Sequence, residues 1–339
     1  MGQAQPIRLG IVGAGIFARE AHVPVLQALR DRFEIVAVCS RTTESTGRLA
    51  ARLDDPVDEV HDLDALLTRP DIDAVDLVLP IPLLPEAVSR ALAAGKHVIS
   101  EKPIAPTLAE ARRLLAQFAV RAGQVWMVAE NYRYEECFVR AAEIVQSGAL
   151  GQIVAGDLAI YIGLDPSNRY YQTAWRRDGS YPGGGILDGG VHHVAGMRMV
   201  LGEVAAVSAV VRQQRADLPP ADTLSAALVF DSGAVVGYSV TYAAAAPWYG
   251  PLQIVGERGA LRILRTGSLE LTVEGSTQTI TVEPLGGVRG EFLAFADAIQ
   301  HGTPHRNTPE QAAQDVAVVE ALLRSGAEGR QVIPERIVR

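Results

Sequence analysis

The segment Gly13-Ala14-Gly15-Ile16-Phe17-Ala18 carries the clearest chemical signal in the sequence. It follows a short apolar run and opens a stretch with helical spacing. In that context the GxGxxA pattern is typical of a dinucleotide site. The first glycine permits a tight turn, the second lets a pyrophosphate approach the backbone, and the small third residue lets helix and strand pack closely. The helix N-terminus then offers free N–H groups to the phosphates. The alternative is a glycine turn in an α/β fold that binds no cofactor.

The residues at the end of the second apolar run should determine whether NAD or NADP is preferred. An acidic residue there would bind the ribose 2′-hydroxyl of NAD. This sequence has Ser40-Arg41-Thr42 instead, and no acid before Glu44. Arg41 can make a paired contact to a 2′-phosphate, and Ser40 and Thr42 can donate to it. We therefore predict NADP in preference to NAD, with NAD still possible. The alternative is that Arg41 is a solvated surface residue and either cofactor is accepted.

The elements that position these residues alternate between strand and helix over the first third of the chain. Apolar runs at 7–12, 33–39, 59–61, 74–79, 97–100 and 125–129 predict six strands, with helical stretches between them. Near-continuous apolar strands separated by helices predict a parallel sheet that is covered on both faces. We expect a doubly wound Rossmann domain over residues 1–129.

The pattern changes after residue 129, where long strands dominate and Gly-containing turns such as Asp231-Ser232-Gly233 separate some of them. Such a pattern predicts a large, open, mainly antiparallel sheet. Residues 130–339 are therefore expected to form a second α/β domain, for substrate binding and oligomerisation. Helices close the chain near 291–300 and 310–325, and we expect that they can pack back on the first domain.

Composition limits the class of protein. The chain has 339 residues, of which 48% are hydrophobic and 21% charged, with a net charge of −8. This balance argues against nucleic acid or an anionic membrane surface as the main partner. No run of 18 apolar residues predicts a membrane span. The two cysteines, Cys39 and Cys137, cannot form a disulfide framework, so a cytoplasmic protein is expected.

Four further segments resemble one known family. They are Gly95-Lys96-His97-Val98-Ile99-Ser100-Glu101-Lys102-Pro103, Asn131-Tyr132-Arg133-Tyr134, Gly148-Ala149-Leu150-Gly151 and Gly183-Gly184-Gly185-Ile186-Leu187-Asp188-Gly189-Gly190-Val191-His192. With the glycine fingerprint they are similar to the glucose–fructose oxidoreductase, inositol dehydrogenase and rhizopine-catabolism family, Gfo/Idh/MocA, over nearly the whole chain. The resemblance implies a Rossmann domain, then an α/β domain with a large open sheet. It also implies hydride transfer between a nicotinamide and a sugar, polyol or related carbonyl or alcohol.

The family's usual catalytic set corresponds here to Lys102, Asp188 and His192. Alcohol oxidation by hydride loss also requires removal of the hydroxyl proton, which suits a histidine. Asp188 stands four residues earlier, on the same face of a helix, and could orient the imidazole or bind a substrate hydroxyl. Lys102 follows the fifth strand and could polarise the reacting oxygen. We expect Lys102 and His192 to converge beside the nicotinamide. Without the family, Lys102 could be a surface lysine and Asp188 a helix cap.

The remaining candidate residues flank these positions. On the cofactor side they are Pro80 and Glu101, and on the substrate side Tyr132, Arg133, Trp175, Arg176 and His193. The segment around Trp175 could instead pack on a partner subunit, and His193 could be a packed histidine. Ile81 and Leu84 replace an Asn and a His that the family often carries, so a more apolar wall is expected there. No metal site is predicted, because a third ligand with suitable spacing is missing.

These observations predict an NAD(P)-dependent oxidoreductase of a small molecule, assembled as a homodimer or homotetramer through the sheet of the second domain. Two other functions stay open. One is a cofactor-binding sensor that detects a metabolite without turnover. The other is an enzyme related to the NAD-dependent glycosidases, which oxidise their substrate only transiently.

Overall fold

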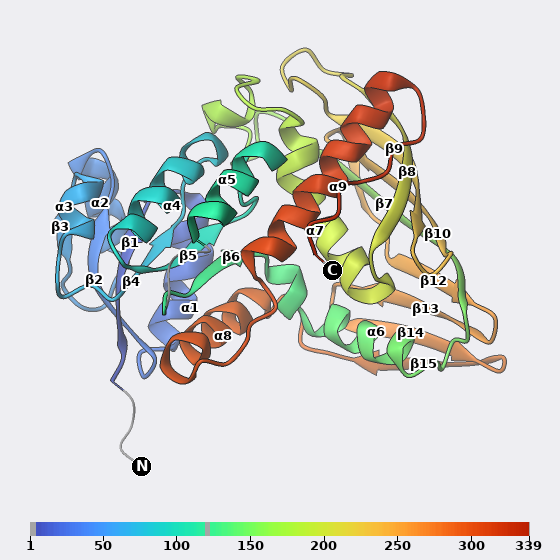
Figure 1. The fold of residues 1–339 in the computed structure, drawn as a ribbon, viewed down its shortest axis with the longest axis horizontal. Coiled ribbons are helices and arrows are strands. Elements are labelled where there is room, and N and C mark those ends of the chain that lie inside the picture. Colours follow the sequence, from blue (N-terminus) through green and yellow to red (C-terminus); the bar gives the residue numbers. More distant parts are fainter. Residues whose placement is uncertain (1–4, 119–122, 339) are drawn as a thin grey trace. The chain divides into compact units, whose positions relative to one another are not determined.

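The computed structural model describes residues 5–118 and 123–338, which divide into two compact units (Figure 1). The first unit contains the chain up to Ala105, Ala109–Asn131 and Val288–Ala313. The second contains Pro106–Leu108, Tyr132–Gly287 and the residues from Gln314 onward. The first unit therefore includes a segment from late in the sequence, and each unit is described by itself below.

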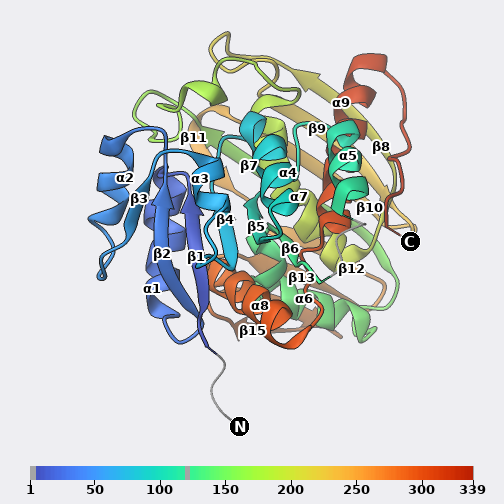
Figure 2. The ribbon, with the colours of Figure 1, turned by 60° about the vertical axis from the view of Figure 1, so that its left-hand side comes forward.

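The first unit is built on a six-stranded sheet with the order β3-β2-β1-β4-β5-β6. The strands are β1 (Ile7–Val12), β2 (Phe33–Cys39), β3 (Asp58–Val60), β4 (Ala74–Leu77), β5 (His97–Glu101) and β6 (Trp126–Ala129). Every neighbouring pair is parallel, and Figure 2 shows β1, β2 and β4 side by side. The predicted doubly wound parallel sheet is confirmed.

The helices of this unit follow the strands, as a parallel sheet requires. They are α1 (Val23–Ala28), α2 (Thr43–Ala50), α3 (Leu63–Leu67), α4 (Leu84–Ala93), α5 (Leu108–Phe118) and α8 (Gly287–His301). Helix α8 comes from the late segment, and it brings Phe292 and Phe295 against Phe33 at the start of β2. All three rings are fully buried, so α8 completes the hydrophobic core of the unit.

The helix expected after the glycine fingerprint forms, but its first part is a π-helix, Ala18–His22, which leads directly into α1. A π-turn holds one more residue than an α-turn and is frequent at functional sites. Ala18 and His22 on this turn are both completely buried. The apolar spacing of the sequence did not reveal this extra residue, because α- and π-turns bury similar residue types.

The second unit contains a nine-stranded sheet, with β15-β14-β13-β12-β7-β10-β9-β8 in order and β11 paired to β7. Its strands are β7 (Ile153–Gly163), β8 (Val204–Arg212), β9 (Thr223–Phe230), β10 (Val235–Thr241), β11 (Ala243–Tyr249), β12 (Leu252–Gly256), β13 (Gly259–Leu264), β14 (Ser268–Val273) and β15 (Ser276–Thr281). Only the β7–β10 pair is parallel among these described strands. The predicted open, mainly antiparallel sheet is confirmed.

The α-helices of this unit in the described part of the chain are α6 (Glu136–Gln146), α7 (Gly184–Leu201) and most of α9 (Pro309–Glu328). Helix α7 packs against α6 and against β9 and β10. It begins after Gly183, whose φ of 81° is the left-handed conformation that favours glycine, and it ends at Gly202. The segment with the Asp188–His192 pair is therefore a long, mostly buried helix.

An ionic network is buried in the core of the first unit. The His22 ring places Nδ1 2.8 Å from Asp76 on β4 and Nε2 3.1 Å from Glu101 at the end of β5. Nδ1 is hydrogen-bonded to Asp76, whereas the contact between Nε2 and Glu101 is an ion pair without hydrogen-bond geometry, and both carboxylates attract the positive charge of a protonated ring. Burial disfavours that charge, but Asp76 and Glu101 outweigh burial and raise the pKa of His22 well above its ordinary value. His22 thus ties together two strands and the turn after the fingerprint.

Replacing His22 should be costly. We expect His22→Ala to lower the free energy of unfolding at pH 7 by about 3–5 kcal/mol, because it leaves two buried carboxylates without their cation. Urea denaturation followed by circular dichroism measures the change. The exposed His301, on α8, supplies the control variant His301→Ala, for which a change below about 0.5 kcal/mol is expected. A loss below about 1 kcal/mol for His22→Ala would show that the network is not ionic.

Glu291 on α8 lies in the same core and makes stability depend on pH. Its side chain is buried, and its Oε2 has no hydrogen-bond partner among the described residues. Burial raises the pKa of Glu291 well above its ordinary value. The folded state therefore holds this proton more tightly than the unfolded state, whose glutamate titrates near about 4.3. The stabilisation is complete below that value and is lost as the pH rises toward the folded pKa.

We expect Glu291→Gln, which keeps the shape without the charge, to flatten this pH dependence. The free energy of unfolding of the variant should match that of the parent near pH 4.5 and exceed it by at least about 1 kcal/mol at pH 8. Urea titrations of both proteins at half-unit steps of pH measure the difference. Curves that stay parallel across this range would contradict the assignment.

Candidate active site

The glycine turn of the fingerprint is fixed by close contacts beneath it. Gly13 has a φ of 103°, and a Cβ there would lie 2.1 Å from the carbonyl oxygen of Val78. Its amide donates to the Cys39 carbonyl oxygen at 2.8 Å, which joins the turn to the end of β2. Any side chain at position 13 would clash with the backbone of Val78, directly after β4. The first glycine is therefore a requirement of the sheet edge itself.

The outer side of the same turn is open. A Cβ on Gly15 would meet nothing within 4 Å, and the residue is exposed. Ala18, the third position of the fingerprint, is completely buried where the helix meets the sheet. Ile16 and Phe17 are half-buried between them. A backbone without side chains above it fits a bulky anion such as a pyrophosphate, so these residues fit a dinucleotide.

The loop after β2 presents Arg41 to solvent. Arg41 is exposed and makes no ion pair among the described residues. Thr42 is the N-cap of α2, where its Oγ1 accepts a hydrogen bond from the Ser45 amide at 3.3 Å. The Thr42 hydroxyl therefore has a structural role in addition to any contact with a ligand. Ser40 lies half-buried at the start of the loop.

At the end of β5, Glu101 is held by His22, and half-buried Lys102 follows it before Pro103. Pro80 is half-buried after β4. The next residues lie elsewhere than expected: Ile81 and Leu84 are buried, at 1% and 0% exposure. These two side chains pack in the core, so the replacement of Asn and His at these positions builds the interior rather than an apolar wall.

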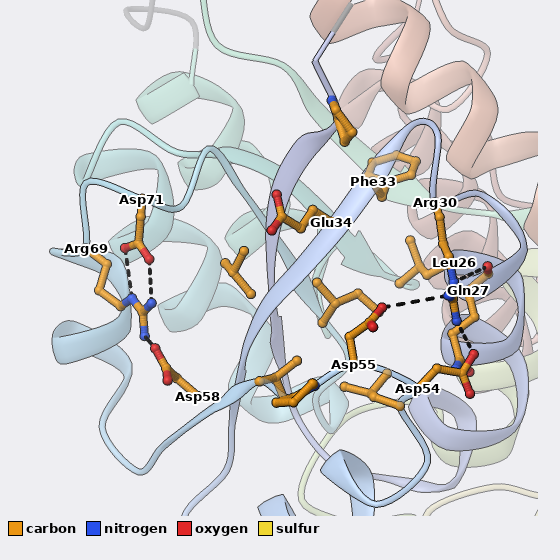
Figure 3. Close-up of a pocket in the computed structure, with 16 residues that line it drawn as sticks. Leu26, Gln27, Arg30, Phe33, Glu34, Asp54, Asp55, Asp58, Arg69 and Asp71 are labelled. Atoms are coloured by element: carbon orange, nitrogen blue, oxygen red, sulfur yellow. Dashed lines mark hydrogen bonds and ion pairs between the residues drawn. The ribbon is translucent and has the colours of Figure 1, made fainter.

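A surface pocket of about 510 Å³ lies elsewhere on the first unit (Figure 3). It adjoins the first half of β2, whereas the glycine turn contacts the other end of that strand. Five carboxylates and two arginines line it, and the arginines pair with most of the carboxylates. The carboxylates are Glu34, Asp54, Asp55, Asp58 and Asp71, and the arginines are Arg30 and Arg69. Arg69 bridges Asp58 and Asp71, at 2.8 and 2.5 Å. The excess of carboxylates over arginines disfavours a phosphate in this pocket.

In the second unit, the glycines of α7 admit the ring of Tyr242. A Cβ on Gly185 would lie 2.9 Å from that ring, and one on Gly189 would lie 1.9 Å from its hydroxyl oxygen. Further along the helix, a Cβ on Gly196 would lie 2.8 Å from Phe138 on α6. The glycines around Asp188 and His192 therefore exist because aromatic side chains press directly against the helix backbone.

Asp188 is paired with Arg176, whose Nε donates to the carboxylate at 2.8 Å. The Arg176 guanidinium also lies over the rings of Trp175, at 4.0 Å, and Tyr170, at 5.1 Å. Both charged side chains are half-buried. The structure thus brings together three of the predicted residues, Asp188, Arg176 and Trp175, although they lie on α7 and on the irregular segment before it.

His192 stacks on Tyr132, with ring centroids 4.9 Å apart and an interplanar angle of 17°. The guanidinium of Arg265, which follows β13, lies over the same tyrosine ring at 3.9 Å from its centroid. Arg265 in turn pairs with the buried carboxylate of Glu135, with its Nε at 2.8 Å. His192 is half-buried, so the stack fixes the plane of an imidazole that keeps access to solvent.

Two predicted substrate residues have partners in the interior. Arg133 is buried and donates to Asp315 at 2.6 Å, and Asp315 also pairs with Arg198. His193 is buried, and its Nδ1 lies 2.8 Å from the hydroxyl of Tyr238. These contacts favour a packing role for both residues. His193 points into the interior while His192 does not, because consecutive residues on a helix point in different directions.

Sequence reasoning missed several residues around the pair on α7. Arg265 and Tyr242 come from distant strands, and no local spacing connects them to Asp188 or His192. The hydroxyls of Tyr181 and Tyr242 are buried without a hydrogen-bond partner among the described residues. Burial, with Asp188 contributing, raises the pKa of both tyrosines above the ordinary value, so they are neutral donors. The close contacts with Gly185 and Gly189 reveal Tyr242.

Two structural absences concern the described residues. No group of three or more His, Cys, Asp or Glu side chains in 5–118 and 123–338 is arranged to hold a metal ion. Within the same residues, no helix has the length and hydropathy needed to cross a bilayer.

Both halves of the chain match one family. Residues 7–130 match the oxidoreductase family with an NAD-binding Rossmann fold, GFO_IDH_MocA, and residues 142–333 match the C-terminal alpha/beta domain of that family. The dehydrogenase FPY6 of Fusarium mangiferae is 32% identical over 95% of this chain and 97% of its own length. The D-xylose 1-dehydrogenase (NADP(+)) 2 of Haloferax volcanii is 28% identical over 95% and 98%.

Solved structures agree with this assignment. An oxidoreductase from Thermotoga maritima has a TM-score of 0.90 and 35% identity, covering 98% of this chain and 100% of its own. A levoglucosan dehydrogenase in complex with NADH and levoglucosan has a TM-score of 0.87 at 22% identity, with the same coverage, and it supports the fold alone. The chain therefore belongs to the Gfo/Idh/MocA oxidoreductase family and is an NAD(P)-dependent dehydrogenase or reductase.

Proposed function

We propose that this enzyme transfers a hydride between NADP and a sugar, polyol or related carbonyl or alcohol. The observation that carries the substrate class is the cluster around Asp188. A carboxylate, a guanidinium and two aromatic rings lie together there, with a half-buried histidine one helical turn away. Aromatic faces and paired polar groups suit the apolar and hydroxyl surfaces of a sugar. The H. volcanii relative carries D-xylose and NADP in its name, which agrees with this class.

His192 is the proposed acid/base. A bound nicotinamide would supply the acceptor for the carbinol hydride in the oxidation direction. The hydroxyl proton then goes to the imidazole of His192, and it returns from there in the reduction direction. The flat stack on Tyr132 holds the ring in one plane, so its nitrogen lone pair has a fixed direction. A fixed direction favours proton transfer because misplacement of the base costs rate.

Lys102 and Asp188 have supporting roles in this proposal. The ammonium of Lys102 stabilises negative charge on the reacting oxygen. Asp188 orients the substrate or the imidazole, and its ion pair with Arg176 holds the carboxylate in place. Glu101, Pro80 and the glycine turn belong to the cofactor side. Tyr132, Trp175 and Arg176 remain the proposed substrate-side residues.

The preference for NADP rests on Arg41. It is exposed at the end of β2, where dinucleotide folds bind the adenosine ribose, and no acidic residue occurs between Cys39 and Glu44. A guanidinium makes paired hydrogen bonds to phosphate, whereas an acid would repel it. NAD lacks the 2′-phosphate and gains nothing from this contact.

We also propose assembly through the sheet of the second unit. Large apolar side chains are exposed on several of its strands: Val154 on β7, Val210 on β8, Val235 on β10, Trp248 on β11 and Val255 on β12. Exposed apolar surface of this kind is typical of a protein interface, so a homodimer or homotetramer is proposed. Cys39 and Cys137 are both unpaired, which agrees with the reducing cytoplasm proposed for the protein.

We expect Lys102→Met and His192→Ala each to lower turnover by at least about 10²-fold, while the affinity for NADPH changes little. The substrate is first found by screening sugars, polyols and their carbonyl forms with both cofactors, following the absorbance of the reduced nicotinamide. His301→Ala is the matched histidine control. Variants with the parent's rate on the best substrate would refute these roles.

Lys102 also allows a check that needs no substrate, because the sequence contains two lysines, Lys96 and Lys102. The Lys96 ammonium is buried and donates to the carbonyl oxygens of Arg69 and Ile72, at 2.7 and 2.8 Å. Acetic anhydride should therefore modify the Lys102 side chain first, as read by peptide mass spectrometry. NADP should slow that modification several-fold, and an unchanged rate would contradict a place for Lys102 beside the cofactor.

The screen also separates the two other functions. A sensor would bind NADPH and show no turnover with any compound of the panel. A glycosidase-like enzyme would release an aglycone without net change in the nicotinamide. The intact Lys102, Asp188 and His192 favour the oxidoreductase, because a sensor does not require an acid/base group.

Arg41→Ala should weaken NADPH binding by about ten-fold or more and leave NADH binding nearly unchanged, since only the 2′-phosphate contacts the guanidinium. Fluorescence titration of each reduced cofactor measures the two dissociation constants. Equal losses for both cofactors would show that the 2′-phosphate is not bound at this position.

A further inference from the structure

The end of β3 supplies a residue beside the Arg41 loop that the sequence did not connect with it. Strands β2 and β3 are parallel, with Cys39 opposite Val60. The residues that follow the two strands are therefore neighbours, and the Ser40 amide donates to the Val60 carbonyl oxygen at 3.2 Å. The next residue on the β3 side is His61, which is exposed.

His61 spans the loop that begins at Ser40. Its Nδ1 lies 3.1 Å from the Ser40 carbonyl oxygen, and its Nε2 lies 3.4 Å from Thr43 Oγ1. A carbonyl oxygen only accepts, so Nδ1 carries a hydrogen and donates it. The hydrogen bond at Nε2 is weak, because 3.4 Å is a long distance for a hydrogen bond. The ring is thus fixed through one nitrogen and has the other near the loop surface.

The carboxylates near this loop have partners of their own. Glu44 pairs with Arg48 at 3.3 Å, Glu59 accepts from the Thr46 hydroxyl, and Asp62 accepts from the Ala65 amide at 2.8 Å. Among the described residues, neither Arg41 nor His61 forms an ion pair with a carboxylate. The exposed loop therefore presents two basic side chains, and the acids beside it are engaged within α2, β3 and α3.

We propose that His61 is a second binding residue for the adenosine 2′-phosphate, beside Arg41, and that it helps to select NADP over NAD. The inference rests on the proposed NADP preference and extends it to a residue from another strand. A phosphate oxygen accepts a hydrogen bond from Nε2 when the ring is protonated, while Nδ1 keeps its bond to Ser40. A dianionic phosphate favours that protonated ring, so binding of the 2′-phosphate takes up a proton at His61. The 2′-hydroxyl of NAD carries no charge and gives no such advantage.

The test uses fragments that separate the phosphate from the rest of the cofactor. Adenosine 2′,5′-bisphosphate carries the 2′-phosphate, and 5′-AMP lacks it. Isothermal titration calorimetry measures both ligands against the parent protein, His61→Ala, His61→Gln and the control His301→Ala. We expect His61→Ala to weaken the bisphosphate about ten-fold and to change 5′-AMP by less than about two-fold. His61→Gln, which keeps a neutral donor, should lose less, and His301→Ala should match the parent.

A second readout is proton uptake, because a residue that only holds the loop would not change it. Titrations at pH 7.5 in buffers of different ionisation enthalpy give the protons bound with the bisphosphate. The parent should take up more protons than His61→Ala, and the difference should vanish with 5′-AMP. Equal uptake in the two proteins, equal losses for both ligands, or no loss at all would overturn the role of His61.

Measurements on the parent protein test the proposed NADP preference separately from the role of His61. If the parent binds 5′-AMP as tightly as the bisphosphate, the NADP preference itself is wrong, and His61 loses its role with it. If the parent prefers the bisphosphate and His61→Ala keeps that preference, Arg41 or another residue selects NADP and only the inference about His61 fails.

Discussion

The parallel register of the sheet in the first unit decides where every proposed cofactor residue lies. Parallel strands end at one edge, so the segments after β1, β2, β3, β4 and β5 share that edge, although β1 ends at Val12 and β5 only at Glu101. Gly13 shows how tightly the edge is built, because its amide bonds to the end of β2 while its Cα faces the Val78 carbonyl. On the outer side of the same turn, the backbone at Gly15 is open to solvent.

The ionic network beneath this edge explains how it stays in place. His22 lies on the π-turn that follows the glycines and pairs with carboxylates on β4 and β5. One buried side chain thus joins the turn after the glycines to Glu101, the residue that precedes Lys102. Buried charges of this kind add little net stability compared with apolar packing, but they disfavour alternative arrangements because a misplaced partner would leave a charge unpaired.

The second unit uses glycine for a different purpose. On α7 the missing side chains admit Tyr242 and Phe138 against the helix backbone, at Gly189 and Gly196. The space so created is filled by these two aromatic rings. His192 gains a flat partner in Tyr132, and Asp188 gains a cation in Arg176. A helix with ordinary side chains at these glycines would push those rings away.

The sequence by itself determined the two α/β domains, the glycine turn and the family. Periodicity, turn residues and spaced motifs are local properties of the chain. Tertiary structure alone decided which groups meet. Local spacing carries no information on the register of β3 beside β2, which brings His61 to Ser40, or on the π-turn that directs His22 to Asp76. It likewise could not show that Arg133 belongs to Asp315, or that Arg265 lies over the tyrosine that stacks on His192. Each of these contacts joins residues far apart in the chain, and only the packing of whole elements sets their distance.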